Sequence, residues 1–205
     1  MKKTKRRVKV NLVLSLVVCI LVLIMLYCIL NIFHNIQSKA QSSVEILDTI
    51  HGYDYELNEN DSAYFKSLFE ELKKVLEKDE VDEEMYASLI AKLFVTDFYS
   101  LDCALNKNDV GGVQFVYKDY RTDFISKAKT SVYNYVQNDI YGDRKQELPM
   151  VTNVEVDDIS SQEYLFEDIA EDDNAYMVTL SISYAKDLSY PQTVTLVLIH
   201  DQNKL

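Results

Sequence analysis

The side chains best suited to chemistry are scattered along this 205-residue chain. Its three histidines are His34, His51 and His200, and none has a Cys, Asp or Glu at the spacing of a metal site. Cys103 is the one cysteine beyond the N-terminal apolar run. It could pair with His200 as nucleophile and base, but it follows an apolar helical stripe, which favours a place in the core. The sequence therefore predicts no catalytic residue, no metal and no cofactor.

Four other residues form the candidate ligand pocket: Tyr117, Tyr120, Arg121 and Phe124. Their spacings of three, one and three place them on one broad face of a helix. Aromatic rings beside an arginine can orient a ligand in a pocket. The alternative is a core face at helical spacing, with Arg121 paired to a carboxylate. We expect this face to meet the strand at 176–184.

Acidic and basic residues elsewhere predict structure rather than chemistry. Asp143-Arg144 is expected to hold the loop between the last helix and the first strand. Glu167-Asp168 and the run 171–174 could bind calcium, but they lack the spacing of a calcium loop and favour a solvated turn.

Three apolar stripes with three-four spacing predict three helices. The first follows a cap at Asp61 or Ser62, the second begins at Asp82, and the third covers 116–140 and ends at Gly142. Beyond Pro149 the apolar period becomes two, which predicts strands at 150–158, 163–169, 176–184 and 194–198. We therefore expect an α+β fold, with three helices packed on a curved antiparallel sheet of about four strands.

An N-terminal anchor precedes this domain in the predicted organisation. Six basic residues in 1–9 stand before an apolar run, and residues 10–33 have the length of a transmembrane helix. Basic residues favour the cytoplasmic side, which places residues 52–205 outside the cell as a single-pass protein. Residues 34–51 are expected to form a stalk. A cleaved signal peptide is the alternative, but the apolar run is long for one.

Charge bears on the expected partners. Beyond the basic segment the chain has 15 Lys and Arg and 33 Asp and Glu, which gives this part a formal charge of −18. Such a domain repels phosphate backbones, so the sequence predicts no nucleic-acid partner. The expected partners are the lipid bilayer, through residues 10–33, and other proteins, with a second copy of this chain among them.

The segments 108–117 and 141–149, with Tyr120-Arg121 and Phe124, look like those of uncharacterised single-pass membrane proteins of low-GC Gram-positive bacteria. Three helices followed by a four-stranded meander also resembles the cone-like fold of the nuclear-transport-factor-2 superfamily. The resemblance covers roughly residues 52–205 and implies a pocket between helices and sheet. It implies no activity, because fold alone does not transfer function.

The expected function is therefore that of a membrane-anchored extracytoplasmic domain for protein–protein interaction in a cell-envelope assembly, without enzymatic activity. One alternative is a component of a conjugation or secretion apparatus. Another is a small-ligand-binding or hydrolytic domain that uses the cone pocket.

Overall fold

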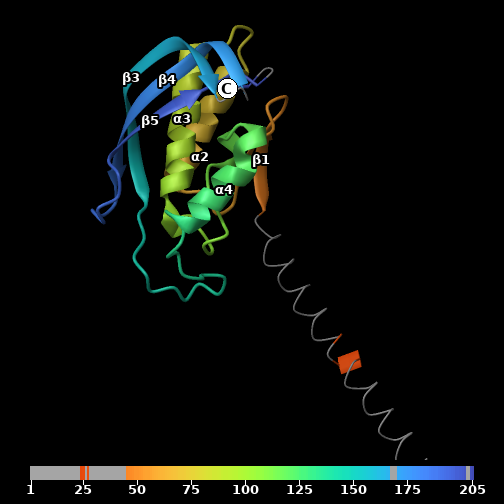
Figure 1. Cartoon of the computed structure of the whole chain (residues 1–205), viewed down its shortest axis with the longest axis vertical. Helices are drawn as coiled ribbons and strands as arrows, with labels where there is room; N and C mark the ends of the chain where they lie inside the picture. The colour runs from red at the N-terminus through yellow and green to blue at the C-terminus, as the bar shows by residue number, and fades with distance from the viewer. Residues whose placement is uncertain (1–23, 26, 28–44, 167–169, 202–203) are drawn as a thin grey trace, which may run out of the picture. The chain divides into compact units, whose positions relative to one another are not determined.

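The computed structural model describes residues 24–25, 27, 45–166, 170–201 and 204–205 (Figure 1). The chain divides into two compact units, Met1–Ser43 and Val44–Leu205. The predicted transmembrane helix at 10–33 lies outside the described residues except for Ile24, Met25 and Tyr27, which are helical. Within the described part, no helix combines the length and the apolar character that a membrane crossing requires. The transmembrane helix of the expected fold is therefore not found there.

The Val44–Leu205 unit begins with a small hairpin. Strands β1 (Ile46–Ile50) and β2 (Tyr55–Asn58) pair antiparallel in a two-stranded sheet. Gly52 in the connecting turn has a φ of 88°, a left-handed conformation that glycine adopts at little cost. Tyr55 and Leu57 alternate with exposed neighbours and are buried, so β2 presents one face to the core. The hairpin includes residues that the sequence analysis assigns to a stalk.

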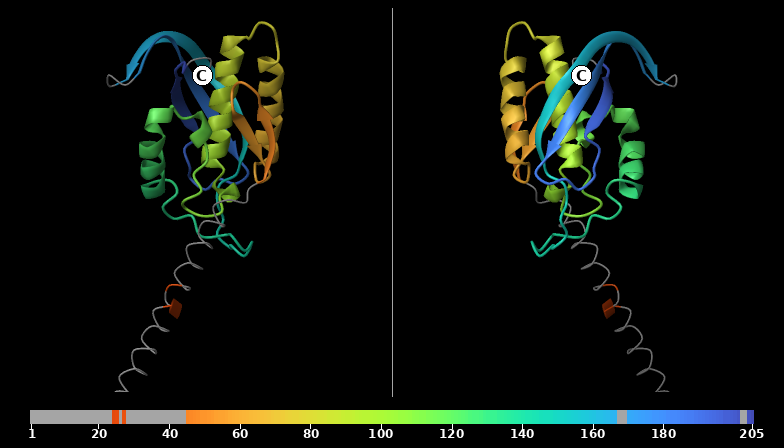
Figure 2. Two further views of the ribbon diagram at one scale, coloured as in Figure 1. Left: turned by 90° about the vertical axis from the view of Figure 1, so that its right-hand side faces the viewer. Right: turned by 90° about the vertical axis from the view of Figure 1, so that its left-hand side faces the viewer.

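The first two predicted helices are confirmed as α2 (Ala63–Leu76) and α3 (Glu83–Tyr99). The Ser62 hydroxyl accepts a hydrogen bond from the Phe65 amide at 3.0 Å, and the Asp82 carboxylate accepts one from the Met85 amide at 3.0 Å. Both side chains satisfy amides that have no partner within the helix. Helix α3 lies between α2 and α4 (Figure 2), and it buries residues around most of its circumference. It is the central element of the core.

The third helix is much shorter than expected. After 3₁₀ turns at Leu101–Cys103, Val113–Phe115 and Lys118–Tyr120, α4 covers only Arg121–Thr130, so the prediction of a helix over 116–140 is wrong.

Tertiary contacts explain why α4 stops. The hydroxyl of buried Tyr133 donates to the Phe98 carbonyl at 2.8 Å and accepts from the Gly111 amide at 3.0 Å. Just before it, the Thr130 and Ser131 hydroxyls donate to the Lys127 carbonyl. Such hydroxyl bonds compete with the helical ladder, and the anchored tyrosine draws the chain away from the helix axis.

A three-stranded antiparallel sheet completes the domain, in the order β3 (Val151–Phe166), β4 (Ala170–Tyr184) and β5 (Thr193–Leu198). The predicted strands at 150–158 and 163–169 belong to one strand, β3, as far as Phe166, and residues 167–169 lie outside the described residues. The run 171–174, expected as a turn, belongs to β4. The expected single sheet of about four strands is therefore wrong, because the described residues form one two-stranded and one three-stranded sheet.

Burial accounts for the merged strand. Ser160 and Ser161 interrupt the apolar alternation of β3, and both are exposed. They pair with Met177 and Tyr176 on β4, so the ladder continues where polar side chains face solvent. Register shifts at Val156/Asp158 and Gln162/Tyr164 accompany the curvature of the long hairpin over the helices (Figures 1 and 2).

Arg144 fastens the loop between α4 and β3, as the sequence predicts. Its guanidinium donates to the Ala104 and Asp102 carbonyls at 2.6 Å each. The Asp102 and Asp139 carboxylates lie 3.6 and 3.7 Å from it, and its side chain is only 3% exposed. A single side chain thus joins residues about 40 positions apart.

Candidate functional site

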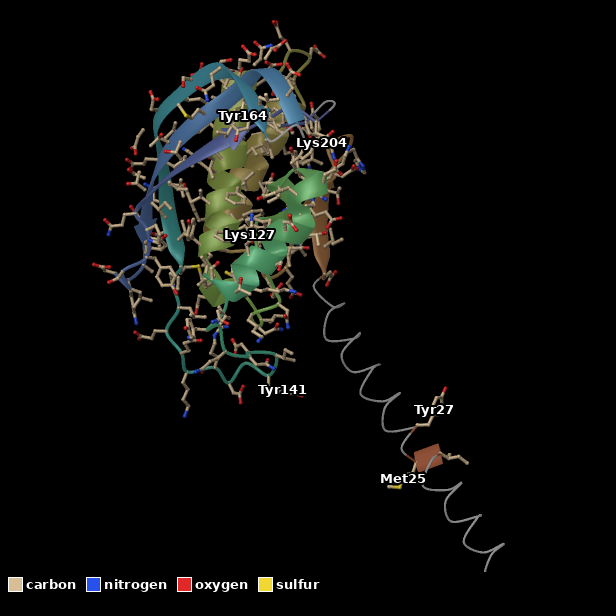
Figure 3. All side chains as sticks on the ribbon, in the orientation of Figure 1. Met25, Tyr27, Lys127, Tyr141, Tyr164 and Lys204 are labelled. Carbon is tan, nitrogen blue, oxygen red and sulfur yellow. The ribbon has the colours of Figure 1, made fainter. Side chains whose placement is uncertain are left out.

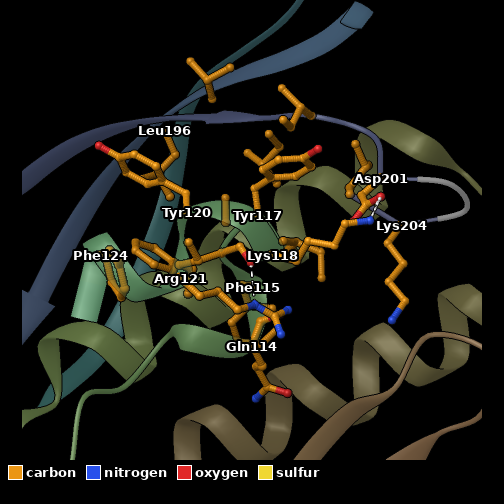
Figure 4. A pocket seen from close by; sticks show the side chains of 18 of the residues that line it. Gln114, Phe115, Tyr117, Lys118, Tyr120, Arg121, Phe124, Leu196, Asp201 and Lys204 are labelled. Carbon is orange, nitrogen blue, oxygen red and sulfur yellow. Dashed lines mark hydrogen bonds and ion pairs between the residues drawn. The ribbon is translucent and has the colours of Figure 1, made fainter. Parts of the chain in front are cut away.

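A cavity of about 380 Å³ opens between α3, the segment 113–124 and the end of β5 (Figure 4). All four residues of the predicted ligand pocket line it, namely Tyr117, Tyr120, Arg121 and Phe124. Most of the remaining lining is apolar. It includes Ile90, Ala91, Phe94, Phe115, Val116, Leu196, Val197, Leu198 and Ile199.

Two glycines bring the segment 113–124 against α3. A Cβ at Gly111 would lie 2.4 Å from the Asp97 carbonyl oxygen, which is closer than any side chain can approach. Gly112 has a φ of 76°, and a Cβ there would lie 2.9 Å from the Phe94 ring. The Asp97 carboxylate also accepts a hydrogen bond from the Gly112 amide at 2.6 Å. The pair therefore sets how closely one wall of the cavity approaches α3.

Arg121 holds the same wall from within. Its Nε donates to the Val116 carbonyl at 2.8 Å, and a terminal nitrogen donates to the Gln114 carbonyl at 3.0 Å. Among the described residues, no carboxylate forms an ion pair with Arg121, so the partner that the core alternative requires is not found there. The guanidinium thus joins the turn at 113–115 and the residue after it to the start of α4, while its charge stays at the cavity.

Gln114 connects this wall to the hairpin. Its side-chain oxygen accepts from the Glu56 amide at 2.8 Å, and its side-chain nitrogen donates to the Glu56 carbonyl at 3.1 Å. The two bonds extend the backbone pattern of β2 onto the segment 113–124 and limit its freedom to move.

The aromatic side chains of the site lie near two different elements, α3 and β5. Phe124 packs its ring against Phe94 and Phe98 of α3, with ring centroids 5.8 and 5.3 Å apart. Tyr117 precedes the 3₁₀ turn at 118–120, Tyr120 ends it, and both lie below β5 in Figure 4. The cavity lining contains residues of β5 and none of 176–184, so the strand with which this face shares the cavity is β5 and not the expected one.

Hydrogen-bonded tyrosines close the inner end of the cavity. Tyr55 donates to the Leu205 carbonyl at 2.9 Å and shares a 2.8 Å hydrogen bond with Tyr86. The Leu205 amide donates to the Tyr86 hydroxyl at 3.2 Å, so the three groups form a ring. Burial raises the pKa of Tyr55 far above its ordinary value, so its hydroxyl stays protonated, and Lys204 Nζ lies 5.9 Å from the centroid of its ring.

Cations gather at the cavity although the domain is acidic. Lys118, Arg121 and Lys204 line it, and Asp201 is the one carboxylate among the described lining residues. Lys118 lies 3.3 Å from Asp201, and Lys204 lies 3.2 Å from Asp54. Lys118 and Lys204 are thus each paired with a carboxylate, whereas Arg121 has no ion pair among the described residues, so its charge favours an anionic group at this place.

A second, polar cavity of about 260 Å³ contains the carboxylates of Asp61, Asp97 and Asp109. Each accepts a hydrogen bond from a backbone amide, respectively those of Asn58, Gly112 and Leu105. These bonds fix the loops that carry the three amides. They explain why the three carboxylates lie here, and no bound ligand is needed to explain it.

Among the described residues, the fold does not bring Cys103 and the histidines together. Cys103 contacts Met150, and burial raises the pKa of its thiol to about 11, so the thiol stays protonated at neutral pH. His200 bonds through Nδ1 to Asp172 at 2.8 Å, and His51 is exposed in the first hairpin turn. His34 and the Glu167-Asp168 part of the calcium hypothesis lie outside the described residues. The exposed carboxylates of Glu163, Glu171 and Asp173 cluster on β3 and β4.

Comparison with known proteins adds no assignment: no family model, curated protein or solved structure matches this chain. The resemblance drawn from the sequence is therefore not confirmed.

Sequence reasoning identified one wall of the cavity and missed the other. Leu196 and Leu198 were recognised as strand residues, but nothing local indicates that they face residues about 75 positions earlier. Lys204 and Asp201 follow the last strand and give no motif at all.

Proposed function

We propose that the Val44–Leu205 unit forms a non-enzymatic binding domain, which the segment 10–33 anchors in the membrane with the domain outside the cell. The domain would bind a partner protein of the cell envelope through the cavity beside Tyr117 and Arg121. The observation that carries this proposal is a cavity with an apolar, aromatic lining and a cationic side at Lys118, Arg121 and Lys204.

Physical chemistry supports binding at this place. Binding sites are typically concave and apolar, with a few polar groups that orient the ligand. Aromatic residues and arginine are also enriched where protein interfaces gain most of their energy. The cavity has both features, and the hydrogen bonds of Arg121 and Gln114 keep its wall in place before a partner arrives. Preorganisation lowers the entropy cost of binding.

Site-specific photocrosslinking in intact cells tests the proposal. A benzoylphenylalanine at position 117 should form one defined adduct, and the same group at Tyr141 should not. Tyr141 is 86% exposed and lies at the opposite end of the domain from Lys204 (Figure 3), so it controls for random collision. Equal labelling from both positions, or none from position 117, would contradict a binding role for the cavity.

The topology has its own test. Protease added to intact protoplasts should remove the chain beyond Gln37, because the proposal places the domain outside. Protection of that domain, with digestion of the basic segment 1–9, would reverse the orientation.

A small-molecule ligand is the second candidate, and the size of the cavity favours it. A volume of about 380 Å³ lies within the range of small-ligand pockets, roughly 300–1,000 Å³. Lipid extracts co-purifying with the full chain, analysed by mass spectrometry, would distinguish this candidate. A stoichiometric small molecule that the variant Phe124→Trp excludes would favour it over a protein partner.

A further inference from the structure

Strand β5 has an open edge beside the cavity. The Ile182 amide donates to the Gln192 carbonyl at 2.8 Å, which identifies 182 and 192 as a hydrogen-bonded pair. In an antiparallel ladder such pairs recur every second residue, so Val194, Leu196 and Leu198 direct their backbone groups toward β4. The amides and carbonyls of Thr193, Thr195 and Val197 therefore point outward. Within the described chain, no backbone group bonds to them.

The opposite edge of the same sheet is covered at Val154. The Tyr64 hydroxyl on α2 accepts from the Val154 amide at 2.9 Å and lies 3.3 Å from the Val154 carbonyl oxygen. The β5 edge has no comparable cover among the described residues. Its sequence from Thr193 to Ile199 carries no charge and no proline, the usual devices that prevent strand addition.

We propose that β5 accepts an extended peptide segment of the partner protein as an added strand. This inference rests on the proposed function and names the form of the partner. The side chains of an added strand alternate between the two faces. Those on the side of Leu196 and Leu198 enter the cavity, since both residues line it. The six residues of β5 offer an edge of roughly 20 Å.

Charge identifies the chemistry of this segment. Lys118, Arg121 and Lys204 stand at the cavity that the peptide would enter. The side chains of the fitting segment that enter the cavity are therefore apolar ones together with an Asp or Glu that reaches these cations. A second copy of this chain is the less suitable occupant, because pairing β5 with β5 would bring two sets of these cations together. Such pairing would also bring two strongly negative domains close together, and they would repel each other.

Peptide selection on the full chain in detergent micelles tests the proposal. The probe is a phage-displayed library of random ten-residue peptides, from which the most enriched sequence is synthesised. We expect the every-second positions that enter the cavity to hold apolar residues and at least one Asp or Glu. Methylation of its backbone nitrogens, one at a time, should weaken binding at least tenfold at every second position, because only alternate amides face the edge.

Substitutions in β5 itself test the same edge. Val197→Pro removes an outward amide, which an edge strand tolerates, and should weaken peptide binding at least tenfold. Thr195 lies outside the cavity lining, so Thr195→Pro should weaken binding as much, whereas Thr195→Ala, which keeps the amide, should change binding less than threefold. Thr195→Pro repeats the test should Val197→Pro fail to fold. Lys118→Gln combined with Lys204→Gln should weaken binding of the acidic peptide and reduce its dependence on salt.

Each contrary outcome has a distinct meaning. A selection without enrichment, or methylation effects without alternation, overturns strand addition. If position 117 still crosslinks to one protein, the proposed function stands. Loss of both results removes both proposals. A dimer of the full chain that Val197→Pro converts to a monomer would identify a second copy as the occupant and overturn the partner peptide.

Discussion

The hydroxyl of Tyr64 lies 2.9 Å from the amide nitrogen of Val154, so α2 satisfies a backbone group at the β3 edge of the sheet. Val154 is almost fully buried. A buried amide without a partner is costly, so this contact joins the helical layer to the sheet through a hydrogen bond as well as through apolar packing.

Tyr64→Phe tests that contact. The ring stays, but the Val154 amide loses its acceptor, and we expect the free energy of unfolding to fall by about 1–3 kcal/mol. Urea denaturation of the full chain, followed by circular dichroism, measures the change. Tyr141→Phe is the control, because Tyr141 is exposed, and it should leave stability within about 0.5 kcal/mol. Equal effects of the two substitutions would show that the hydroxyl of Tyr64 contributes nothing.

Local signals account for what the sequence predicted correctly. Helices α2 and α3 were recognised because their caps, Ser62 and Asp82, and their apolar stripes lie within the helices or next to them. The four residues at 117–124 were grouped because their spacing places them together even though most of the expected helix is absent. A short-range pattern can therefore group residues correctly even where the longer helix that was predicted around them is wrong.

Long-range contacts account for the errors. The end of α4 depends on the bond of Tyr133 to Phe98, which lies 35 positions away in the sequence. Likewise, Ser160 and Ser161 looked like a break, since the alternation gives no sign that β4 continues opposite them. The cavity needed both kinds of information, because Leu196 and Tyr120 meet only in the folded chain.

Gly112→Ala tests how the cavity wall is placed. The new Cβ would meet the Phe94 ring at 2.9 Å, and the φ of 76° would strain any residue but glycine. Gly142 has a similar φ of 70° but nothing within 4 Å, so Gly142→Ala measures strain alone. Overpacking typically costs about 1–3 kcal/mol, and we expect Gly112→Ala to be more destabilising than Gly142→Ala by that amount. Equal losses in thermal and urea denaturation would mean that Phe94 moves aside freely.

Arg144→Met tests the fastening of the 131–150 loop. Methionine keeps the apolar stem but leaves the Ala104 and Asp102 carbonyls without their donor, which should cost about 2–4 kcal/mol. The exposed neighbour Lys145 provides the control, and Lys145→Met should change stability by no more than about 0.5 kcal/mol. Limited proteolysis should cut the loop of the Arg144 variant first. A variant as stable and as protease-resistant as the wild type would refute the role of Arg144.

Asp97→Asn tests a destabilising charge. Burial raises the pKa of Asp97 from 3.8 to about 7, and this effect exceeds the opposing one of the Gly112 hydrogen bond. Between these two pH values the native state holds a proton that the unfolded state has released, so the contribution of Asp97 to stability falls as the pH rises through this window. Asparagine can accept the same Gly112 bond without a charge. We expect the variant to be more stable than the wild type at pH 8, by about 1–3 kcal/mol.

The pH dependence separates this cause from a simple change of packing. At pH 4 both side chains are neutral in the native state, so the advantage of Asp97→Asn should largely disappear there. Urea denaturation of both proteins at pH 4, 6 and 8 measures the difference, with the exposed substitution Asp119→Asn as the control for overall charge. An advantage that is the same at all three pH values would mean that Asp97 does not titrate in this window, and that the cavity it shares with Asp61 and Asp109 solvates its charge.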